Sequence, residues 1–211
     1  MVRQEVRDTA ERMLQLGLTS GTSGNVSARV PGQQELAITP SGMTYDRIKA
    51  EDIVGLDMSG KRVWGSRRPS SEWALHLLFY QNRQDVGAVV HTHSPYATAA
   101  GVLGMEIPMI LAESVAVIGG TIPIAPYIIF GTRELAEAAV QACGKKNAVL
   151  LANHGVVALG KDLESALHTA LVVEETAKIY LLAKSAGEPK VLSDTDLPAM
   201  FKAFGNYHIQ E

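Results

Sequence analysis

The sequence has almost no cysteine, no long apolar run and no concentration of basic charge. Cys143 is the single cysteine among 211 residues, which excludes an internal disulfide framework and fits a reducing compartment. No stretch of about 18 apolar residues is free of charge, so no membrane span is expected. The opening residues, MVRQEVRDTAERM, are too polar for the apolar region of a signal peptide. These absences predict a cytoplasmic protein.

The charge pattern excludes a further class of protein. The 19 Lys and Arg residues are scattered and stand against 22 Asp and Glu, giving a net charge of −3, unlike the basic stripe of a nucleic-acid binder. Internal repeats, low-complexity tracts and obvious linkers are also missing. Because 46% of the residues are hydrophobic, the chain can bury a sizeable core. We expect one domain over residues 1–211, with neither nucleic acid nor membrane as a partner.

Helical and strand patterns alternate along the chain. Two apolar segments read as hairpins, one around Met58-Ser59-Gly60 and one around Asn153-His154-Gly155. A central sheet that is mixed or largely antiparallel, with helices on its faces, is therefore predicted. The helical pattern covers residues 3–16, 68–83, 94–104, 132–144, 162–182 and a final stretch from 193.

Two histidines stand one residue apart where an apolar strand ends, in VVHTHSP. Residues i and i+2 of a strand share a face, so His91 and His93 project side by side at the strand exit. Two neutral imidazoles on one face supply two corners of a metal site. The alternative is one core histidine with satisfied hydrogen bonds and one surface histidine.

A third histidine, His154 in LLANHGVV, also ends an apolar strand, and the glycine after it permits a sharp turn. Three strand-end histidines in a chain with few others resemble a catalytic metal triad with an open fourth position. His76 lies four residues after Glu72, on the same helix face, where a ligand, a supporting contact and simple packing are all open. His168 and His208 receive no role.

Glu72 follows Pro69-Ser70-Ser71 at a predicted helix start. Acidic side chains are favoured there by the helix dipole without any function. Beside a dication, however, Glu72 would serve as a fourth ligand or a general base. Three clusters of hydroxyls and backbone amides suit a phosphate, although each alone is ordinary turn chemistry. They are Gly21-Thr22-Ser23-Gly24-Asn25, Thr39-Pro40-Ser41-Gly42 and Ser70-Ser71.

These motifs together resemble the class II aldolase/adducin family. The segments that carry the resemblance follow one another in the family's order and cover nearly the whole chain, including the tail VLSDTDLPAMFKAFG. They are GTSGNVSAR, ITPSGMTYDRI, PSSEWALHLLFYQNR, AVVHTHSPYATA, IPIAPYIIFGTREL and LANHGVVALGKDLESALHTA.

The resemblance implies a three-layer α/β/α sandwich with a mixed, mostly antiparallel sheet, assembled as a C4 homotetramer with active sites at subunit interfaces. It implies one Zn²⁺ per subunit on His91, His93 and His154, with Mn²⁺, Co²⁺ or Fe²⁺ as alternatives. Glu72 would ligate the free metal and act as acid/base once substrate displaces it. The implied phosphate cradle is Thr22, Gly24, Asn25, Ser41, Gly42, Ser70 and Ser71.

The implied reaction is cleavage of a ketose 1-phosphate, L-fuculose 1-phosphate or a related deoxy-sugar phosphate, to dihydroxyacetone phosphate and a short aldehyde. This chain departs from the family's aldolases in lacking their tyrosine, which protonates the aldehyde oxygen, in residues 110–114. It also has Phe204 where those aldolases have a second tyrosine. Tyr207, Tyr127 and Glu113 are the candidate substitutes.

Other activities of this family stay open. The pentulose-phosphate 4-epimerases have SSD where this chain has Ser70-Ser71-Glu72, and Glu72 followed by Trp73 favours an aldolase. A dehydratase or decarboxylase of a sugar phosphate, a metal hydrolase and a non-catalytic adducin-like binding domain are the remaining alternatives.

Overall fold

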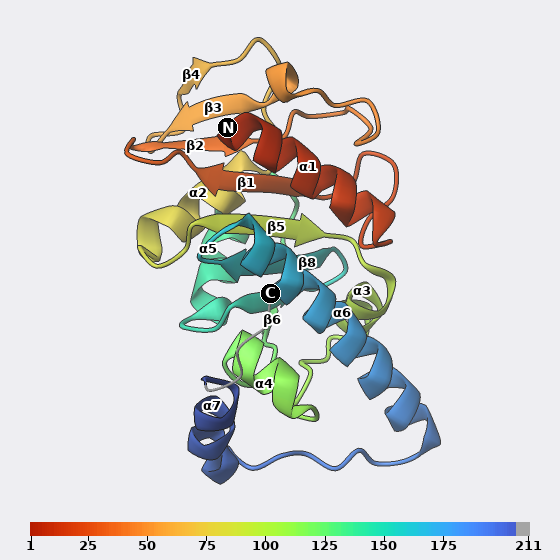
Figure 1. Ribbon diagram of the computed structural model, residues 1–211. Helices are drawn as coiled ribbons and strands as arrows, with labels where there is room; N and C mark the ends of the chain where they lie inside the picture. Colours follow the sequence, from red (N-terminus) through yellow and green to blue (C-terminus); the bar gives the residue numbers. More distant parts are fainter. Residues whose placement is uncertain (206–211) are drawn as a thin grey trace.

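The computed structural model describes residues 1–205 and centres on a mixed eight-stranded sheet (Figure 1). The strand order is β4-β3-β2-β1-β5-β8-β7-β6, and every pair is antiparallel except β6 with β7. The strands are β1 (Asn25–Arg29), β2 (Glu35–Ile38), β3 (Val54–Asp57), β4 (Arg62–Trp64), β5 (Ala88–Thr92), β6 (Ile124–Ala125), β7 (Ala148–Leu151) and β8 (Gly155–Gly160).

Helices cover both faces of this sheet, with α1 and α6 on the near face in Figure 1 and α2 and α5 on the far one. The expected three-layer α/β/α sandwich is therefore confirmed. The helices are α1 (Val2–Gln15), α2 (Trp73–Asn82), α3 (Pro95–Val102), α4 (Ala112–Ile118), α5 (Arg133–Cys143), α6 (Leu163–Ala186) and α7 (Leu197–Gly205), with short 3-10 turns η1 (Ala50–Asp52) and η2 (Asp194–Asp196).

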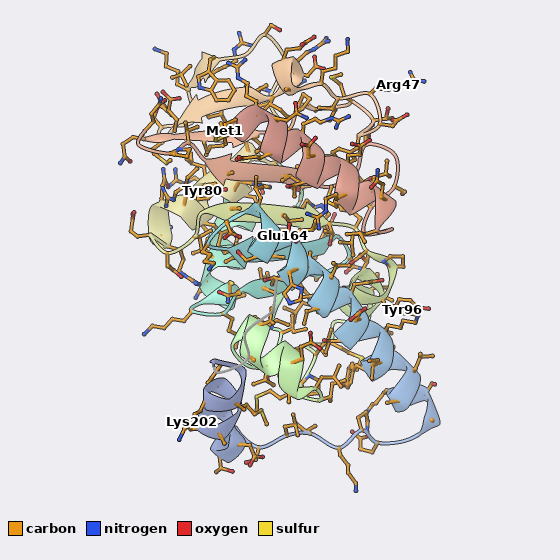
Figure 2. All side chains as sticks on the ribbon, in the orientation of Figure 1. Met1, Arg47, Tyr80, Tyr96, Glu164 and Lys202 are labelled. Carbon is orange, nitrogen blue, oxygen red and sulfur yellow. The ribbon has the colours of Figure 1, made fainter. Side chains whose placement is uncertain are left out.

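The core consists of two apolar layers, one on each face of the sheet. In β5, Val89 packs toward α2 and α5, whereas Ala88 and Val90 pack toward α1 and α6. All five residues of β5 are buried, which explains its unbroken apolar run. The fully buried Tyr80 extends the far-side core from α2 (Figure 2).

The antiparallel pairing places the start of β1, the end of β5 and the start of β8 side by side at one end of the central strands. The start of β1 pairs with the end of β5, placing Asn25 opposite His91. The start of β8 lies on the other side of the same strand, with Thr92 opposite Val156. Side chains that leave these three strands at this end therefore meet, although they lie far apart along the chain.

The local signals predicted most helices. Thr132 and Asp162 cap α5 and α6 as expected, each accepting a hydrogen bond from the backbone N–H three residues on. Residues 119–132 form a strand only at Ile124–Ala125, and helix α4 lies outside the predicted helical ranges. Within residues 1–205, none of the helices is both long enough and apolar enough to cross a membrane.

Candidate active site

The three predicted histidines converge at this end of the central strands. The ring centroids of His91, His93 and His154 lie 4.9, 4.9 and 5.0 Å apart, nearly an equilateral triangle. His91 is the fourth residue of β5 and His93 follows the strand directly. His154 comes from the turn between β7 and β8, whose preceding residue, Asn153, has a φ of 55°. The strand-exit geometry expected for His91 and His93 is present.

Gly155 permits this close approach. A Cβ atom at Gly155 would lie 2.2 Å from the carbonyl oxygen of Thr92 and 3.2 to 3.3 Å from the rings of His93 and His91. The first of these distances is shorter than any non-bonded contact allows. The glycine after His154 therefore lets β8 start directly beside the two histidines of β5.

Glu72 completes a four-residue cluster. It is the N-cap of α2, and its backbone N–H donates to Ser70 Oγ at 3.2 Å. Its side chain is only 8% exposed, with Oε2 3.2 Å from His91 Nε2 and Oε1 3.4 Å from His154 Nε2. One ligand atom from each of Glu72, His91, His93 and His154 lies within 4.8 Å of all the others. Glu72 therefore faces the histidines rather than solvent.

The donor set fits a divalent metal ion. His91 Nδ1 donates to the carbonyl oxygen of Val156 at 2.8 Å, which directs Nε2 toward the cluster. His93 Nε2 lies 3.1 Å from His91 Nε2, so two ring nitrogens face each other. Glu72 Oε1 is buried with no hydrogen-bond partner among residues 1–205. Facing lone pairs and an unpartnered carboxylate oxygen are costly without a cation between them.

The electrostatics of the cluster support this fit. Burial lowers the pKa of both His93 and His154 to about 4, so these rings are neutral ligands at neutral pH. Burial alone would raise the pKa of Glu72, but His91, His154 and Asn25 together lower it, so the carboxylate stays charged. Burial likewise opposes charge on His91, but Glu72 raises its pKa. A proton on His91, or a metal ion in its place, thus balances Glu72.

A cavity of about 380 Å³ opens beside this cluster. It is lined by all seven residues of the phosphate cradle that the family resemblance implies, together with Glu72, His93 and His154. The lining residues are Thr22, Ser23, Gly24, Asn25, Pro40, Ser41, Gly42, Ser70, Ser71, Glu72, His93, Phe130 and His154. The three polar clusters therefore converge, although they come from three separate loops.

Backbone pairing assembles the cradle. Pro40 and Pro69 form an isolated antiparallel bridge. Around it, Ser41 N donates to Arg68 O at 2.9 Å and Ser70 N donates to Thr39 O at 3.0 Å. Gly24 closes the third side, with a φ of 75° and no room for a Cβ atom, which would lie 2.5 Å from the carbonyl oxygen of His91. The loop can approach the histidine strand only with glycine there.

Asn25 differs from the other cradle residues. Its side chain is buried, and its Nδ2 donates to Glu72 Oε2 at 2.9 Å while its Oδ1 contacts His76 Nε2. Both ends of the amide are thus occupied by protein groups. Sequence reasoning did not find these contacts of His76, nor Phe130 on the cavity wall, where the only signal is an apolar residue before a glycine.

The candidate proton donors lie away from this cavity in the described chain. Tyr127 is 62% exposed and precedes Phe130 by three residues, but it is not among the lining residues. Glu113 is exposed in the first turn of α4. Tyr207 lies outside the described residues. The identity of the proton donor therefore stays a prediction.

The fold is a three-layer α/β/α sandwich, and a Glu-His-His-His cluster lies at the end of its central strands. This is the arrangement that the resemblance to the class II aldolases implies. Residues 4–181 match the family model described as Class II Aldolase and Adducin N-terminal domain. The chain belongs to the class II aldolase and adducin family.

Two relatives and a solved structure narrow the comparison. The 5-deoxy-D-ribulose 1-phosphate aldolase of Bacillus thuringiensis serovar kurstaki is 42% identical over 205 residues, covering 97% of this chain and 96% of the relative. The L-fuculose phosphate aldolase of Escherichia coli K12 is 40% identical over 208 residues, covering 98% and 95%. A solved L-fuculose 1-phosphate aldolase superposes with a TM-score of 0.93 at 42% identity, covering 97% of this chain and 96% of that one. This chain is a class II aldolase.

Proposed function

We propose that this chain cleaves a ketose 1-phosphate to dihydroxyacetone phosphate and a short aldehyde. L-fuculose 1-phosphate and a 5-deoxypentulose 1-phosphate are the substrates to test first, because the two relatives act on compounds of these kinds. The observation that carries the proposal is the shared cavity. Its wall contains the carboxylate and two of the histidines of the four-residue cluster, together with three uncharged loops that are suited to binding a phosphate.

We infer that His91, His93, His154 and Glu72 hold a zinc ion, for which three imidazoles are a favoured ligand set, with Mn²⁺, Co²⁺ and Fe²⁺ as alternatives. When bound, the ion supplies positive charge beside the reacting carbonyl and stabilises the negative charge that develops there. The protein residues around it bind the substrate, orient it and move protons.

The cradle holds the phosphate with uncharged donors. Hydroxyls of Thr22, Ser41, Ser70 and Ser71 and the backbone amides of Gly24 and Gly42 line the cavity, and the lining includes neither Lys nor Arg. Backbone amides and hydroxyls bind phosphate through oriented dipoles. Asn25 contributes by a different route in this proposal, because its side chain already contacts Glu72.

Glu72 is the acid/base in this mechanism. When the carbon–carbon bond breaks, the aldehyde leaves and its hydroxyl proton must be taken up elsewhere. The carbon that keeps the bonding electrons then needs a proton. Glu72, which is ionised in the free site, first takes up a proton from water in the cavity and then delivers it to this carbon. Tyr207, Tyr127 and Glu113 remain the candidates for the hydroxyl proton.

The decisive assay is a retro-aldol screen over a panel of ketose 1-phosphates, with dihydroxyacetone phosphate detected by a coupled reductase. Metal-stripped protein and the Glu72→Gln variant are the matched controls, and both should lose the signal. Release of inorganic phosphate would indicate a hydrolase instead. Interconversion of pentulose 5-phosphates without dihydroxyacetone phosphate would indicate an epimerase. Elemental analysis that finds no bound transition metal after gentle purification would favour a non-catalytic adducin-like domain.

Three substitutions test the proton donor separately. Tyr127→Phe and Tyr207→Phe each remove one hydroxyl group, and Glu113→Gln replaces a titratable carboxyl group by an amide of nearly equal volume. The variant that loses cleavage while keeping zinc binding identifies the donor. If all three retain full cleavage rates, none of these residues protonates the aldehyde oxygen.

We further infer a C4 homotetramer whose subunit interfaces border the active sites. Tyr127, Ile129 and Phe130 support this inference, because these apolar side chains are 62, 56 and 60% exposed and Phe130 lies on the cavity wall. Native mass spectrometry should show four copies. A monomer with full cleavage activity would contradict it. A cytoplasmic location stays a prediction from the sequence.

A further inference from the structure

A chain of buried polar side chains runs from α2 through β1 to the candidate acid/base. Tyr80 OH lies 2.8 Å from Ser27 Oγ, which lies 2.7 Å from His76 Nδ1. His76 Nε2 contacts Asn25 Oδ1, and Asn25 Nδ2 donates to Glu72 Oε2 at 2.9 Å. Four of the five residues are between 0 and 3% exposed, and Glu72 is 6% exposed. The chain is therefore shielded from water.

The carboxylate of Glu72, at one end of the chain, sets the direction of every hydrogen bond in it. An ionised carboxylate only accepts, so the amide of Asn25 must turn its NH₂ group toward Glu72 and its oxygen toward His76. His76 must then carry its proton on Nε2 and accept from Ser27 at Nδ1. Ser27 in turn accepts from the phenol of Tyr80. All the donors point the same way, toward Glu72.

The opposite arrangement is unfavourable. With the amide reversed, Asn25 would place its oxygen 2.9 Å from a carboxylate oxygen of Glu72, where two acceptors repel each other. In the favoured arrangement the neutral ring of His76 donates from Nε2 to Asn25 Oδ1 and accepts from Ser27 at Nδ1, so His76 adds a hydrogen bond that the reversed amide would keep only with the other ring tautomer. Burial also lowers the pKa of His76 to about 3, so the ring is neutral and has one acceptor and one donor nitrogen.

We propose that His76 is a positioning residue that locks the Asn25 amide, so that Asn25 holds Glu72 Oε2 and leaves Oε1 directed at the histidine triangle. This inference rests on the proposed aldolase function. The chain orients and does not conduct, since an amide nitrogen cannot relay a proton onward. His76, Ser27 and Tyr80 thus act on the metal and the substrate only through Glu72.

The central test compares two substitutions of His76. His76→Leu removes both ring nitrogens, whereas His76→Gln keeps an N–H group that can donate to Asn25. Zinc affinity of the stripped protein is measured by competition with a fluorescent chelator, and cleavage kinetics are measured alongside. We expect His76→Leu to weaken zinc binding by roughly 10- to 100-fold and to lower kcat more than it changes KM. His76→Gln should recover most of the loss.

A double-substitution cycle separates positioning from general destabilisation. If His76 acts through Glu72, adding His76→Leu to the Glu72→Gln variant should change zinc affinity no further. A purely structural role predicts the same additional loss in both backgrounds. Equal losses, or failure of His76→Gln to restore zinc binding, would overturn the proposal.

Two milder variants keep the test informative should His76→Leu not fold. Ser27→Ala removes the hydroxyl that holds Nδ1, and we expect zinc binding to weaken by about threefold to tenfold, a smaller effect than the direct loss of a supporting contact. Thr176→Val, which removes a buried hydroxyl of α6 bonded to the Val172 carbonyl oxygen, is the matched control and should leave zinc affinity unchanged. An unchanged affinity in Ser27→Ala contradicts the inference.

The zinc measurements do not depend on the substrate being right. If wild-type protein cleaves none of the ketose phosphates, the proposed function fails, while the affinity cycle still decides the role of His76. If cleavage is present and the cycle is additive, the aldolase stands and the positioning role falls.

Discussion

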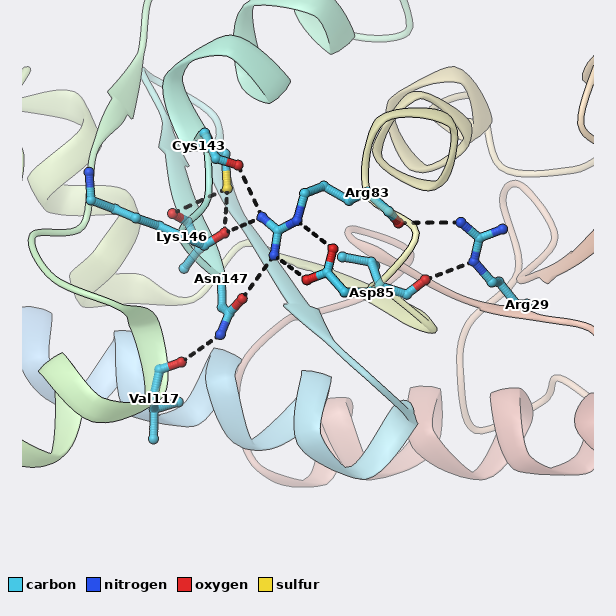
Figure 3. A network of polar contacts seen from close by, with 10 residues as sticks. Arg29, Arg83, Asp85, Val117, Cys143, Lys146 and Asn147 are labelled. Carbon is cyan, nitrogen blue, oxygen red and sulfur yellow. Dashed lines mark hydrogen bonds and ion pairs between the residues drawn. The ribbon is translucent and has the colours of Figure 1, made fainter. Parts of the chain in front are cut away.

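The two ends of strand β5 carry polar clusters of opposite design. Before its start, all five N–H groups of Arg83 have acceptors: both oxygens of Asp85, the Asn147 side chain, and the carbonyl oxygens of Gly144 and Lys146 (Figure 3). At its exit, His91 and His93 face each other through ring nitrogens, and Glu72 Oε1 has no hydrogen-bond partner in residues 1–205.

The difference distinguishes a structural cluster from a functional one. A polar group that serves the fold is satisfied by its neighbours, as the partly buried Arg83 is where it joins the loop before β5 to the loop before β7. A cluster that serves chemistry retains unsatisfied acceptors, at a cost in stability that the rest of the fold must offset. The exit of β5 should therefore govern activity, and the start of β5 should govern stability.

The largest expected effect comes from Glu72→Gln. Losing the carboxylate should lower the cleavage rate by about 10²- to 10⁴-fold, the usual contribution of a general acid/base. The unfolding free energy of the metal-free protein should also fall, because the lowered pKa of Glu72 means that its charge is favoured in the folded state beside His91. Steady-state kinetics and urea denaturation give both quantities. Full activity in this variant would remove Glu72 from the mechanism.

Arg83→Met should show the reverse. The variant leaves two carbonyl oxygens without their donor, whereas the 67% exposed Asp85 side chain is solvated by water, so we expect a loss of about 1 to 2 kcal/mol in unfolding free energy. The cleavage rate of the folded fraction should stay within about twofold of the wild type, since that cluster has no contact with the candidate site. A large fall in kcat without loss of stability would break the comparison.

Removing zinc should take away stabilisation that depends on the cluster at the exit of β5 and not on the Arg83 cluster. At a free zinc concentration 100 times the dissociation constant, binding stabilises the folded protein by about 2.7 kcal/mol. Wild type and Arg83→Met should therefore gain a similar increment when zinc is restored, whereas His93→Ala should gain much less. Thermal melts with and without chelator measure this. An equal gain in His93→Ala would place the zinc elsewhere.

The last expected effect is a pH dependence of the metal-free protein. The pKa of His76 is about 3 and those of His93 and His154 about 4 in the folded state, below the ordinary 6.5, so unfolding takes up protons and acid destabilises the fold.

The relevant window is pH 4.5 to 6.5, above the ordinary pKa of Glu72 and below that of His91, where the stabilising contributions of those two groups are constant. The melting temperature of the metal-free protein should fall by several degrees as the pH is lowered from 6.5 to 4.5. Arg83→Met should lower the whole curve without altering its slope, and His93→Gln should flatten it. A flat wild-type curve would contradict the buried neutral histidines.

Sequence reasoning found the fold class and the members of the candidate site. Strand-end histidines and clustered hydroxyls are local signals, and His91, His93 and His154 do converge with Glu72. The sequence could not show that Asn25 lies opposite His91, because strand register is set by non-local pairing. The open role of His76 follows from that gap, and the cradle role of Asn25 stays a prediction.

Helix α4 was missed for a different reason. Residues 107–120, IPMILAESVAVIGG, are apolar almost throughout, and a short apolar stretch has neither the helical nor the strand period. Helix α4 has seven residues and ends at Gly119, which has a φ of 94° and forms a left-handed C-cap. Without a longer periodic stretch before it, this glycine could not be recognised as a helix end from the sequence.

The central position of β5, between β1 and β8, also sets the order in which the protein can mature. The residues that meet at its exit come from positions 25, 72, 91, 93 and 154, so the site cannot exist until residues 155–160 have added to the growing sheet. During synthesis, a nascent chain shorter than about 160 residues has the histidine pair but no place to hold it. Metal loading should therefore follow translation of β8 and report on completion of the sheet.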